Sequence, residues 1–320
     1  MKRIAVLTSG GDSPGMNAAI RAVVRCGIDY GMEVYGITRG YEGLLDGEIR
    51  QMDRNSVGDI LHKGGTILKT ARSERFKTPE GIKRAAEMLR TFGIEGLVVI
   101  GGDGSMRGAR ELSLQGVTVM CLPGTIDNDL GYSDFTIGFD TAVNTVLDAI
   151  TKLRDTSSAH DRTTVIEVMG RDCGDIALYA GLAGGAEAVL IPEVPVDLNE
   201  ICRKIIEGSN RGKLHSIIIK AEGVEMTSGE LARTIEERTG KESRKVVLGY
   251  LQRGGNPTLN DRTLATLTAA KAVELLWKGS ESKAIGMTQG AVVTYTLEDA
   301  INLPREFNQN MYNLITVLSK

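Results

Sequence analysis

Short, almost purely apolar runs recur along this 320-residue chain and are separated by segments with helical periodicity. These runs cover residues 4–7, 34–37, 97–100, 117–122, 165–168, 188–191, 217–219 and 246–248. Strands without polar alternation are covered on both faces, which is typical of parallel sheets whose strands are connected by helices. The sequence therefore predicts an α/β fold of two doubly wound lobes with mainly parallel sheets.

The segments between the runs have the spacing of helices with one buried face. In residues 140–156 the apolar positions follow the i, i+3, i+4, i+7 pattern, and a second strong helix is expected over 264–276. A chain of this length suggests about two domains. Because the glycine-rich turns lie in the first 130 residues, we expect one lobe from 1–138 plus about 253–305. The other lobe would then take about 139–252 plus 306–320.

Composition excludes several classes of function. The chain is 42% hydrophobic and 25% charged, which is enough to bury a core, and its net charge of −3 gives no electrostatic footprint for nucleic acid. No apolar run approaches the roughly 20 residues that span a bilayer, and Gly10 interrupts the first run too early for a signal peptide. The cysteines form no CxxC pattern, which favours a reduced, cytoplasmic location.

An acidic turn follows the apolar run 117–122. It places Thr125, Asp127 and Asp129 just beyond a predicted strand, where open α/β sheets bind their ligands. One carboxylate there could take a proton from a substrate hydroxyl while its neighbour helps to hold metal-bound phosphates. The alternative is an ordinary acidic turn that caps the next element.

Two glycine-rich turns, 8–17 and 101–105, also follow predicted strands and open helices. Glycines allow the backbone to approach a ligand, and the helix N-terminus offers free N–H groups to phosphate. Asp103 could hold Mg²⁺ on such phosphates, although tight turns and a helix cap explain the same residues. Neither turn is a GxGxxG or Walker A motif. Together with the acidic turn at the same end of one sheet, they favour phosphoryl transfer.

Candidate cationic groups occur in two sets. The first set consists of Arg72, Arg162, Arg171, Arg244 and Arg253, with Glu222 as a candidate acceptor for sugar hydroxyls. Arg171 and Arg253 lie in glycine-containing turns at strand ends, where a guanidinium can grip phosphate bidentately. The second set consists of Arg21 and Arg25 on one helix face, Arg154 at the end of the helix from 140, and Arg211, Lys213 and His215. Scattered surface charge is the alternative interpretation of both sets.

Over nearly its whole length the chain resembles the bacterial ATP-dependent 6-phosphofructokinase family. The resemblance is carried by residues 8–17, 101–105, 123–129, 169–171, 221–223 and 252–255, with Asp261 and Arg262. It implies an ATP-binding lobe, a sugar-phosphate-binding lobe, and a cytoplasmic homotetramer with sites at subunit interfaces. The implied glycolytic reaction transfers the γ-phosphoryl group of MgATP to the 1-hydroxyl of fructose 6-phosphate. Nucleic acid and membranes are not expected partners.

The resemblance also implies residue roles. Asp127 would be the base, Thr125 would contact the phosphoryl group, Asp103 with Asp129 would organise Mg²⁺, and Arg171 with Arg72 would stabilise developing charge. The residues implied to bind ATP are Gly11, Arg72, Ser73, Gly102, Asp103, Gly104 and Ser105. Those implied for the sugar phosphate are Thr125, Ile126, Asp127, Arg162, Met169, Gly170, Arg171, Glu222, Arg244, Tyr250, Leu251, Gln252 and Arg253, of which Arg162 and Arg244 would reach in from a neighbouring subunit.

A regulatory site for ADP or phosphoenolpyruvate at a subunit interface is implied as well. It would comprise Arg21, Ala22, Val23, Val24, Arg25, Arg154, Gly185, Ala186, Glu187, Arg211, Lys213, Leu214 and His215. Binding at such a site regulates activity only if the effector has different affinities for two global states.

Two glycines bear on the phosphoryl donor. Pyrophosphate-dependent members of the family carry Asp at position 104 and Lys at position 124, where this chain has Gly104 and Gly124, so ATP is the expected donor. The chain also departs from the family pattern. Tyr250 replaces a usual His, Lys69 and Ser73 replace an aromatic residue and a Cys, and Met106 with Arg107 replaces a Tyr-containing pair.

Two rival functions share part of these signals. NAD kinases and lipid kinases use a similar Gly-Gly-Asp-Gly turn. Assignment to either class would leave the motifs at residues 123–129 and 169–171 unexplained. A nucleotide-sensing module without activity would have lost the residues of the chemistry, and this chain retains them.

Overall fold

The computed structural model describes residues 1–319, and Lys320, the last residue of the expected second lobe, lies outside the described residues. The chain forms two compact units. Unit 1 contains Met1–Ile126, Leu130–Thr141 and Arg253–Arg305, and unit 2 contains Asp127–Asp129, Ala142–Gln252 and the residues from Glu306. The expected lobes differ from these units in the boundary at 138 and in assigning residues 127–129 to the first lobe.

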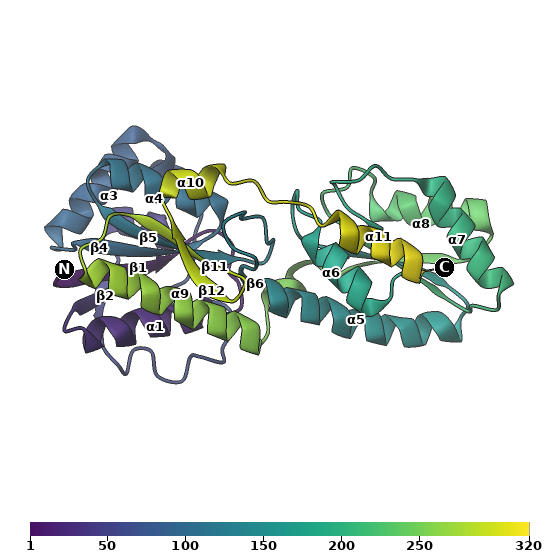
Figure 1. The fold of residues 1–320 in the computed structure, drawn as a ribbon, viewed down its shortest axis with the longest axis horizontal. Helices are drawn as coiled ribbons and strands as arrows, with labels where there is room; N and C mark the ends of the chain where they lie inside the picture. Colours follow the sequence, from purple (N-terminus) through teal and green to yellow (C-terminus); the bar gives the residue numbers. More distant parts are fainter. Residues whose placement is uncertain (320) are drawn as a thin grey trace. The chain divides into compact units, whose positions relative to one another are not determined.

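Unit 1 is built on one sheet, shown in Figure 1. Its strands in spatial order are β12 (Ala291–Tyr295), β11 (Lys283–Thr288), β5 (Thr118–Thr125), β4 (Gly96–Gly101), β1 (Arg3–Thr8), β2 (Glu33–Ile37) and β3 (Ile49–Met52), and β6 (Ile137–Gly138) pairs with β5. The central pairs are parallel, whereas β3 and β12 add antiparallel edges. The carboxyl ends of β1, β4 and β5 therefore lie at one end of the sheet.

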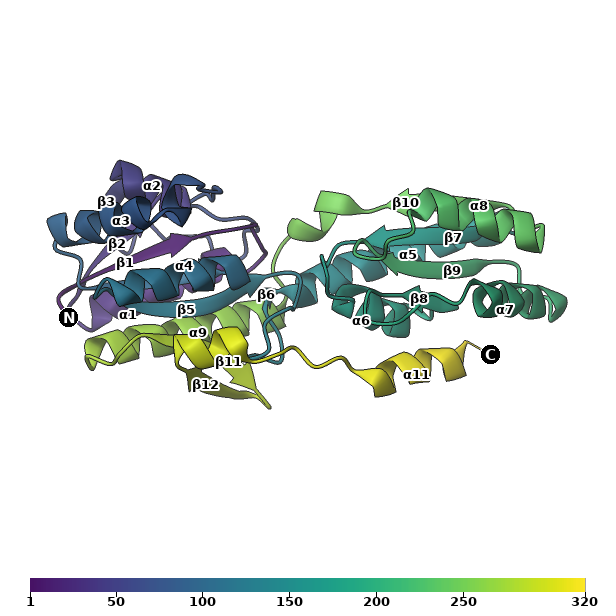
Figure 2. The same ribbon diagram turned by 90° about the horizontal axis from the view of Figure 1, so that it is seen from above.

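Side chains of the central strands alternate between two hydrophobic layers. Ile4 and Val6 of β1 pack in one core with α1 (Met16–Asp29) and α9 (Leu259–Trp277). Ala5 and Leu7 pack in the opposite core. The helices of that second core are α2 (Gly40–Asp46), α3 (Pro79–Thr91), α4 (Asp103–Leu114) and α10 (Leu297–Asn302). Figures 1 and 2 show these two helical layers on the two faces of the sheet. A fully apolar strand is thus required wherever both faces are covered.

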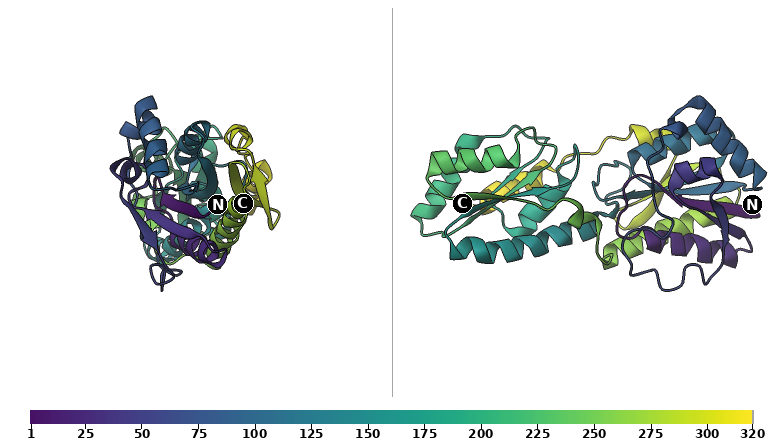
Figure 3. Two further views of the ribbon diagram at one scale, coloured as in Figure 1. Left: turned by 90° about the vertical axis from the view of Figure 1, so that its left-hand side faces the viewer. Right: turned by 180° about the vertical axis from the view of Figure 1, so that it is seen from behind.

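Unit 2 contains a smaller, entirely parallel sheet. Its order is β10 (Ser243–Val247), β7 (Thr163–Val168), β9 (Ser216–Ala221) and β8 (Ala188–Leu190). Its helices are α5 (Phe139–Ala159, which starts in unit 1), α6 (Asp175–Gly184), α7 (Leu198–Asn210), α8 (Ser228–Thr239) and α11 (Gln309–Leu318). α7 and α8 share a core with β7, β8 and β9, and α11 packs on α6 and β8. Figure 3 shows the ribbon in two further views, with the purple N-terminal strand in unit 1.

The α/β prediction is confirmed, with local corrections. All eight apolar runs lie in or overlap strands, but β3, β6, β11 and β12 were not predicted, because edge and very short strands lack a continuous apolar run. The helix expected over 140–156 extends to Ala159, so Arg154 lies inside it rather than at its end. No helix within residues 1–319 is long and apolar enough to cross a membrane.

Candidate active site

The helices of this chain begin in two ways. Six helices start behind a residue whose side chain accepts a hydrogen bond from the first turn; these residues are Thr78, Asp197, Thr227, Thr258, Thr296 and Asn308. In contrast, α1, α4 and α6 start behind Gly15, Gly102 and Gly174, and no side chain caps them. Uncapped first-turn N–H groups and the positive end of the helix dipole favour anions. Two of these three helix ends, those of α1 and α4, belong to the glycine-rich turns of unit 1.

The glycines of these turns serve different purposes. A Cβ on Gly101 would lie 2.5 Å from Ser105 Oγ and 2.6 Å from Ser9 O, so Gly101 allows β1 and α4 to approach. A Cβ on Gly104 would meet nothing within 4 Å. The space above Gly104 can therefore accept part of a ligand, whereas Gly101 is required by packing.

Unit 1 brings several predicted residues to these turns. A Cβ on Gly102 would lie 3.4 Å from Thr125 Cβ, so the end of β5 borders the start of α4. A Cβ on Gly11 would lie 2.9 Å from Arg253 Nη1. Gly11 thus neighbours Arg253, and Gly102 neighbours Thr125. Their predicted contacts with a nucleotide and a phosphoryl group stay predictions.

Asp103 is the first residue of α4, and 39% of its side chain is exposed. Arg107 donates from Nε to Asp103 Oδ2 at 2.8 Å, one helical turn further on. The carboxylate oxygens of Asp103 are hard ligands of the type that Mg²⁺ prefers. Residues 1–319 contain no group of three His, Cys, Asp or Glu side chains that could hold a metal ion. Mg²⁺ on a nucleotide needs only one or two carboxylates, so Asp103 fits that ion.

Gly124 has a packing role that the sequence did not reveal. A Cβ there would lie 2.9 Å from Ile100 Cγ2, 3.1 Å from Gly101 N and 3.1 Å from Met16 Cε. In this chain these contacts favour glycine for packing alone. Gly104, which has no such packing role, is therefore the better indicator of the phosphoryl donor.

The acidic turn lies in unit 2, where it is fixed by side chains. Asp127 is 3% exposed, and Arg171 Nε lies 3.2 Å from Asp127 Oδ2. Asn128 has a left-handed backbone with φ of 56°, and its Nδ2 donates to Asp175 Oδ2 at 2.7 Å. Asn is among the few non-glycine residues that adopt this conformation readily, so it suits this tight turn. The Asn128 anchor holds the turn that presents Asp127 to Arg171.

The turn after β7 carries Arg171 and so lies beside Asp127. Arg171 also has a left-handed backbone, with φ of 53°, and its N–H donates to Glu222 Oε1 at 3.0 Å. Met169 N donates to Gln252 Oε1 at 3.1 Å, and Gln252 is fully buried. The predicted sugar-phosphate residues Met169, Arg171, Glu222 and Gln252 therefore gather with Asp127 within unit 2.

Four other predicted sugar-phosphate residues differ from this group: two are exposed beside Gln252, and two lie at the opposite end of β7. Tyr250 and Leu251 are 78% and 69% exposed on the 3-10 helix Gly249–Arg253. Arg162 Nε donates to Glu242 Oε2 at 2.7 Å, and Arg244 pairs with the same carboxylate. Arg162 precedes β7 and Arg171 follows it, so six residues of extended strand, about 20 Å, separate them. Arg162 and Arg244 cannot join Arg171 within one chain.

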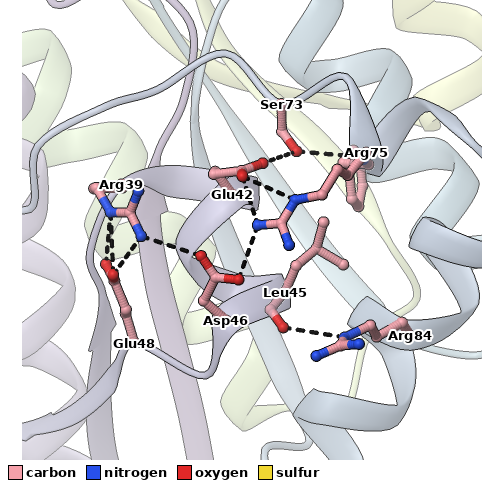
Figure 4. A network of polar contacts seen from close by, with 9 residues as sticks. Arg39, Glu42, Leu45, Asp46, Glu48, Ser73, Arg75 and Arg84 are labelled. Atoms are coloured by element: carbon pink, nitrogen blue, oxygen red, sulfur yellow. Dashed lines mark hydrogen bonds and ion pairs between the residues drawn. The ribbon is translucent and has the colours of Figure 1, made fainter.

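The predicted ATP residues Arg72 and Ser73 lie in the loop before the 3-10 helix Arg75–Lys77. Arg72 is exposed, whereas the Ser73 hydroxyl donates to Glu42 and accepts a hydrogen bond from Phe76 N at 3.1 Å. Figure 4 shows Ser73 turned toward Glu42. The Ser73 side chain is thus engaged within unit 1.

The predicted regulatory residues are divided between the units. In unit 2, Arg154 Nη1 lies 3.2 Å from His215 Nε2, Arg154 also donates to Gly185 O at 3.2 Å, and Lys213 pairs with the buried Glu187. Burial and the Arg154 charge lower the pKa of His215. The structure therefore gathers Arg154, Gly185, Glu187, Lys213 and His215 into one polar cluster.

Within residues 1–319, the other predicted regulatory residues make no side-chain hydrogen bond or ion pair with this cluster. Arg21 and Arg25 are half-buried on α1 of unit 1, whereas Ala22, Val23 and Val24 between them are buried in the core with α9. Arg211 and Leu214 are exposed in the turn that follows α7. The side chains of residues 22–24 are buried within unit 1, and the regulatory role of all these residues stays a prediction.

Sequence reasoning missed two residues that support the site. Asp175 anchors Asn128, and Glu193 Oε1 accepts from Gly174 N at 2.8 Å at the start of α6. Asp175 follows the Cys173-Gly174 turn, and an Asp in that position indicates the start of a helix. The sequence does not indicate its partner, because Asn128 is 47 residues away along the chain.

Comparisons with known proteins bear on the family and on the fold. Residues 3–276 match the model of the family described as phosphofructokinase. A curated protein of Clostridium tetani called ATP-dependent 6-phosphofructokinase is 57% identical over 319 residues, and one of Clostridium botulinum with the same name is 56% identical over 320 residues; the alignments cover 100% of each chain.

Two solved structures have the same fold. The phosphofructokinase of Saccharomyces cerevisiae is 34% identical with a TM-score of 0.88; the match covers 100% of this chain and 48% of that longer chain. A pyrophosphate-dependent phosphofructokinase of Marinobacter aquaeolei, 20% identical with a TM-score of 0.88 over 99% of this chain and 91% of its own, shows the fold alone. With the family model matched over most of its length and relatives above half identity from end to end, the chain belongs to the phosphofructokinase family.

Proposed function

We propose that this chain is an ATP-dependent 6-phosphofructokinase. It transfers the γ-phosphoryl group of ATP to the 1-hydroxyl of fructose 6-phosphate and yields fructose 1,6-bisphosphate and ADP. The observation that carries the proposal is the buried Asp127 carboxylate, whose Oδ2 lies 3.2 Å from Arg171 Nε in a group that includes Glu222. The names of the bacterial relatives, which are identical at more than half of their positions, support it.

The residues of this chain supply the groups that phosphoryl transfer requires. Asp127 accepts the proton of the sugar hydroxyl as the hydroxyl oxygen bonds to the γ-phosphorus and the bond to ADP breaks. Arg171 stabilises the charge that develops on the phosphoryl oxygens, and Thr125 contacts the same oxygens. The uncapped first turns of α1 and α4 donate N–H groups to the nucleotide phosphates.

Mg²⁺ is part of this proposal. The carboxylates that would hold it are Asp103, whose present partner is Arg107, and Asp129. When bound, the ion neutralises charge on the β- and γ-phosphates. Arg107 keeps the Asp103 side chain oriented along α4 in the absence of the ion.

A coupled assay for fructose 1,6-bisphosphate tests the reaction and the donor together. Fructose 6-phosphate with MgATP should give product, and removal of Mg²⁺ by a chelator should abolish it. Pyrophosphate in place of ATP should give none, because the open space above Gly104 suits a nucleotide. Absence of product with ATP would refute the function, and robust turnover with pyrophosphate would refute the donor.

We also propose a cytoplasmic homotetramer whose active sites are completed by a second subunit. Arg162 and Arg244 share Glu242 at the far end of β7 from Arg171, so only another copy of the chain could bring them to the sugar phosphate. Co-expression of Asp127→Asn with the double variant Arg162→Ala, Arg244→Ala tests this. Each variant alone should have little activity, and mixed oligomers should recover part of it. No recovery in mixed oligomers isolated with two tags would refute shared sites.

Effector binding completes the proposal. The cluster of Arg154, Gly185, Glu187, Lys213 and His215 offers cations to a phosphate beside a buried carboxylate, which suits ADP or phosphoenolpyruvate. Replacement of Arg25 and Arg211 together by Ala should weaken the effects of both compounds on fructose 6-phosphate saturation and spare basal activity. Effector responses equal to those of the parent would contradict the regulatory role.

A further inference from the structure

The loop that carries Arg72 is fixed on its N-terminal side by hydrogen bonds to β1 and its following turn. Thr8 Oγ1 donates to Lys69 O at 2.8 Å, and Thr70 Oγ1 donates to Gly10 O at 2.6 Å. Lys69 itself has a left-handed backbone with φ of 56°, a conformation that persists only where surrounding contacts impose it. The chain therefore reaches Arg72 from a fixed direction.

On its C-terminal side the loop is fixed by an ionic network with α2, which Figure 4 shows from close by. Ser73 donates to one oxygen of Glu42, and Arg75 Nε donates to the other at 2.9 Å. Arg75 Nη2 also donates to Asp46 Oδ1 at 2.8 Å. Arg39 Nη2 donates to Asp46 Oδ2 at 3.1 Å. The two oxygens of Asp46 thus join Arg75 of the loop to Arg39 at the start of α2.

Glu42 is the member of this network that the loop contacts most. Only 21% of its side chain is exposed, so water screens its pairing with Arg75 less than it screens an exposed pair. The Ser73 hydrogen bond and the Arg75 charge lower the pKa of Glu42, so it is ionised at neutral pH. Isolated surface ion pairs contribute little, but a network with a bidentate Arg is the exception.

Arg72 differs from the cations that follow it in the loop. Arg75 is paired with Glu42 and Asp46, and Lys77 is paired with Glu74. Within residues 1–319, Arg72 makes no hydrogen bond or ion pair, and its side chain is exposed. The loop is held on both sides of Arg72, and Glu42, Asp46 and Glu74 are paired with other cations. Arg72 is therefore left to bind an anion.

We propose that Glu42 is a positioning residue, which fixes the 68–77 loop through Ser73 and Arg75 and thereby presents Arg72, unpaired, to the phosphates of the phosphoryl donor. The inference rests on the proposed function and extends it to a group that does not touch the nucleotide. Fixing the loop in advance reduces the entropy that nucleotide binding would otherwise lose. Arg75 is the other arginine of the loop, and its guanidinium could also bind the phosphates. Because Glu42 pairs with Arg75, this guanidinium does not compete with Arg72.

A double-mutant cycle tests the proposal. Glu42→Gln should raise KM for ATP, and the Kd of a nonhydrolysable ATP analogue measured by calorimetry, by roughly threefold to tenfold, the loss expected for a network ion pair. KM for fructose 6-phosphate should stay within about twofold. In an Arg72→Gln background the same substitution should have no further effect, because Glu42 acts through Arg72. A purely structural role would give equal losses in both backgrounds and would overturn the proposal.

Matched variants keep the test decisive. Glu74→Gln removes a carboxylate of the same loop that pairs with Lys77, so it should leave both constants unchanged. Arg75→Gln breaks the network from the loop side and should reproduce Glu42→Gln if that variant folds poorly. Unchanged analogue affinity in both network variants would refute the positioning role. Because the calorimetry needs no sugar phosphate, it reports on Glu42 even if the parent makes no bisphosphate, which would contradict only the proposed function.

Discussion

The predicted donor residues in unit 1 and the predicted acceptor residues in unit 2 offer a substrate different parts of the chain. In unit 1 the groups that face the candidate phosphates are backbone N–H groups at uncapped helix starts, made accessible by glycines. In unit 2 the candidate groups are side chains: Arg171 Nε lies 3.2 Å from the Asp127 carboxylate, and Glu222 accepts from the backbone N–H of Arg171.

This difference has a physical cause. Phosphates of a nucleotide carry spread negative charge, which several weakly directional N–H dipoles can match without an ionisable group. Proton abstraction needs one carboxylate at one place, so Asp127 requires the Asn128 and Arg171 contacts that fix it. We therefore expect activity to fall when a side chain is added in unit 1 and when a functional group is removed in unit 2.

The largest effect is expected from the base. Asp127→Asn should lower kcat by roughly 10² to 10⁴, because the amide cannot accept the hydroxyl proton. KM for fructose 6-phosphate should change little, and steady-state kinetics with the coupled assay measures both. The exposed Asp155→Asn on α5 is the matched control. Turnover of the Asp127 variant within threefold of the parent would contradict its role.

An added side chain in unit 1 should produce the next effect. Gly104→Asp should lower kcat/KM for ATP by about 10²-fold, because like charges in contact cost several kcal/mol. The melting temperature should stay near that of the parent, since a Cβ at 104 meets nothing within 4 Å. The neutral variant Gly104→Ala separates charge from size. Normal ATP kinetics in the Asp variant would remove Gly104 as a determinant of the donor.

A substitution at Gly124 should change the stability of the fold. Gly124→Ala should lower the free energy of unfolding by about 1–2 kcal/mol, because its Cβ would press on Ile100 and Met16. Chemical denaturation measures the change, with Gly104→Ala as the control that should not destabilise. Equal stability of both variants would mean that the two glycines have the same role and would contradict the packing argument.

The smallest effect concerns the regulatory cluster of unit 2. The pKa of His215 is lowered from 6.5 by burial and by Arg154, so the folded chain binds this proton less readily than the unfolded chain. The stability from neutral His215 is present above pH 6.5 and is lost as the pH falls toward the folded pKa. His215→Gln should reduce the loss of melting temperature on acidification below pH 6.5, whereas the exposed His160→Gln should not. Ring titration by NMR measures the pKa directly, and an unshifted or raised value would refute the argument.

The regular elements followed from local pattern because burial repeats along one strand or helix. The runs at 4–7 and 97–100 became β1 and β4 for that reason. Strands β3 and β12 could not be predicted in this way, since each is stabilised by pairing at a sheet edge rather than by two covered faces. The turns after β1, β4 and β5 were recognisable because residue type and position at a strand end are both local properties.

By itself the sequence determined the α/β architecture, the glycine turns and the membership of the phosphofructokinase family. Only the tertiary structure decided which polar and charged side chains are paired with one another. Ser73 is bound to Glu42, 31 residues away, and Arg162 is bound to Glu242, 80 residues away. It also distinguished Gly104, beneath open space, from Gly124, enclosed by Ile100 and Met16. Periodicity is fixed by neighbours along the chain, whereas pairing and free space depend on segments that folding brings together.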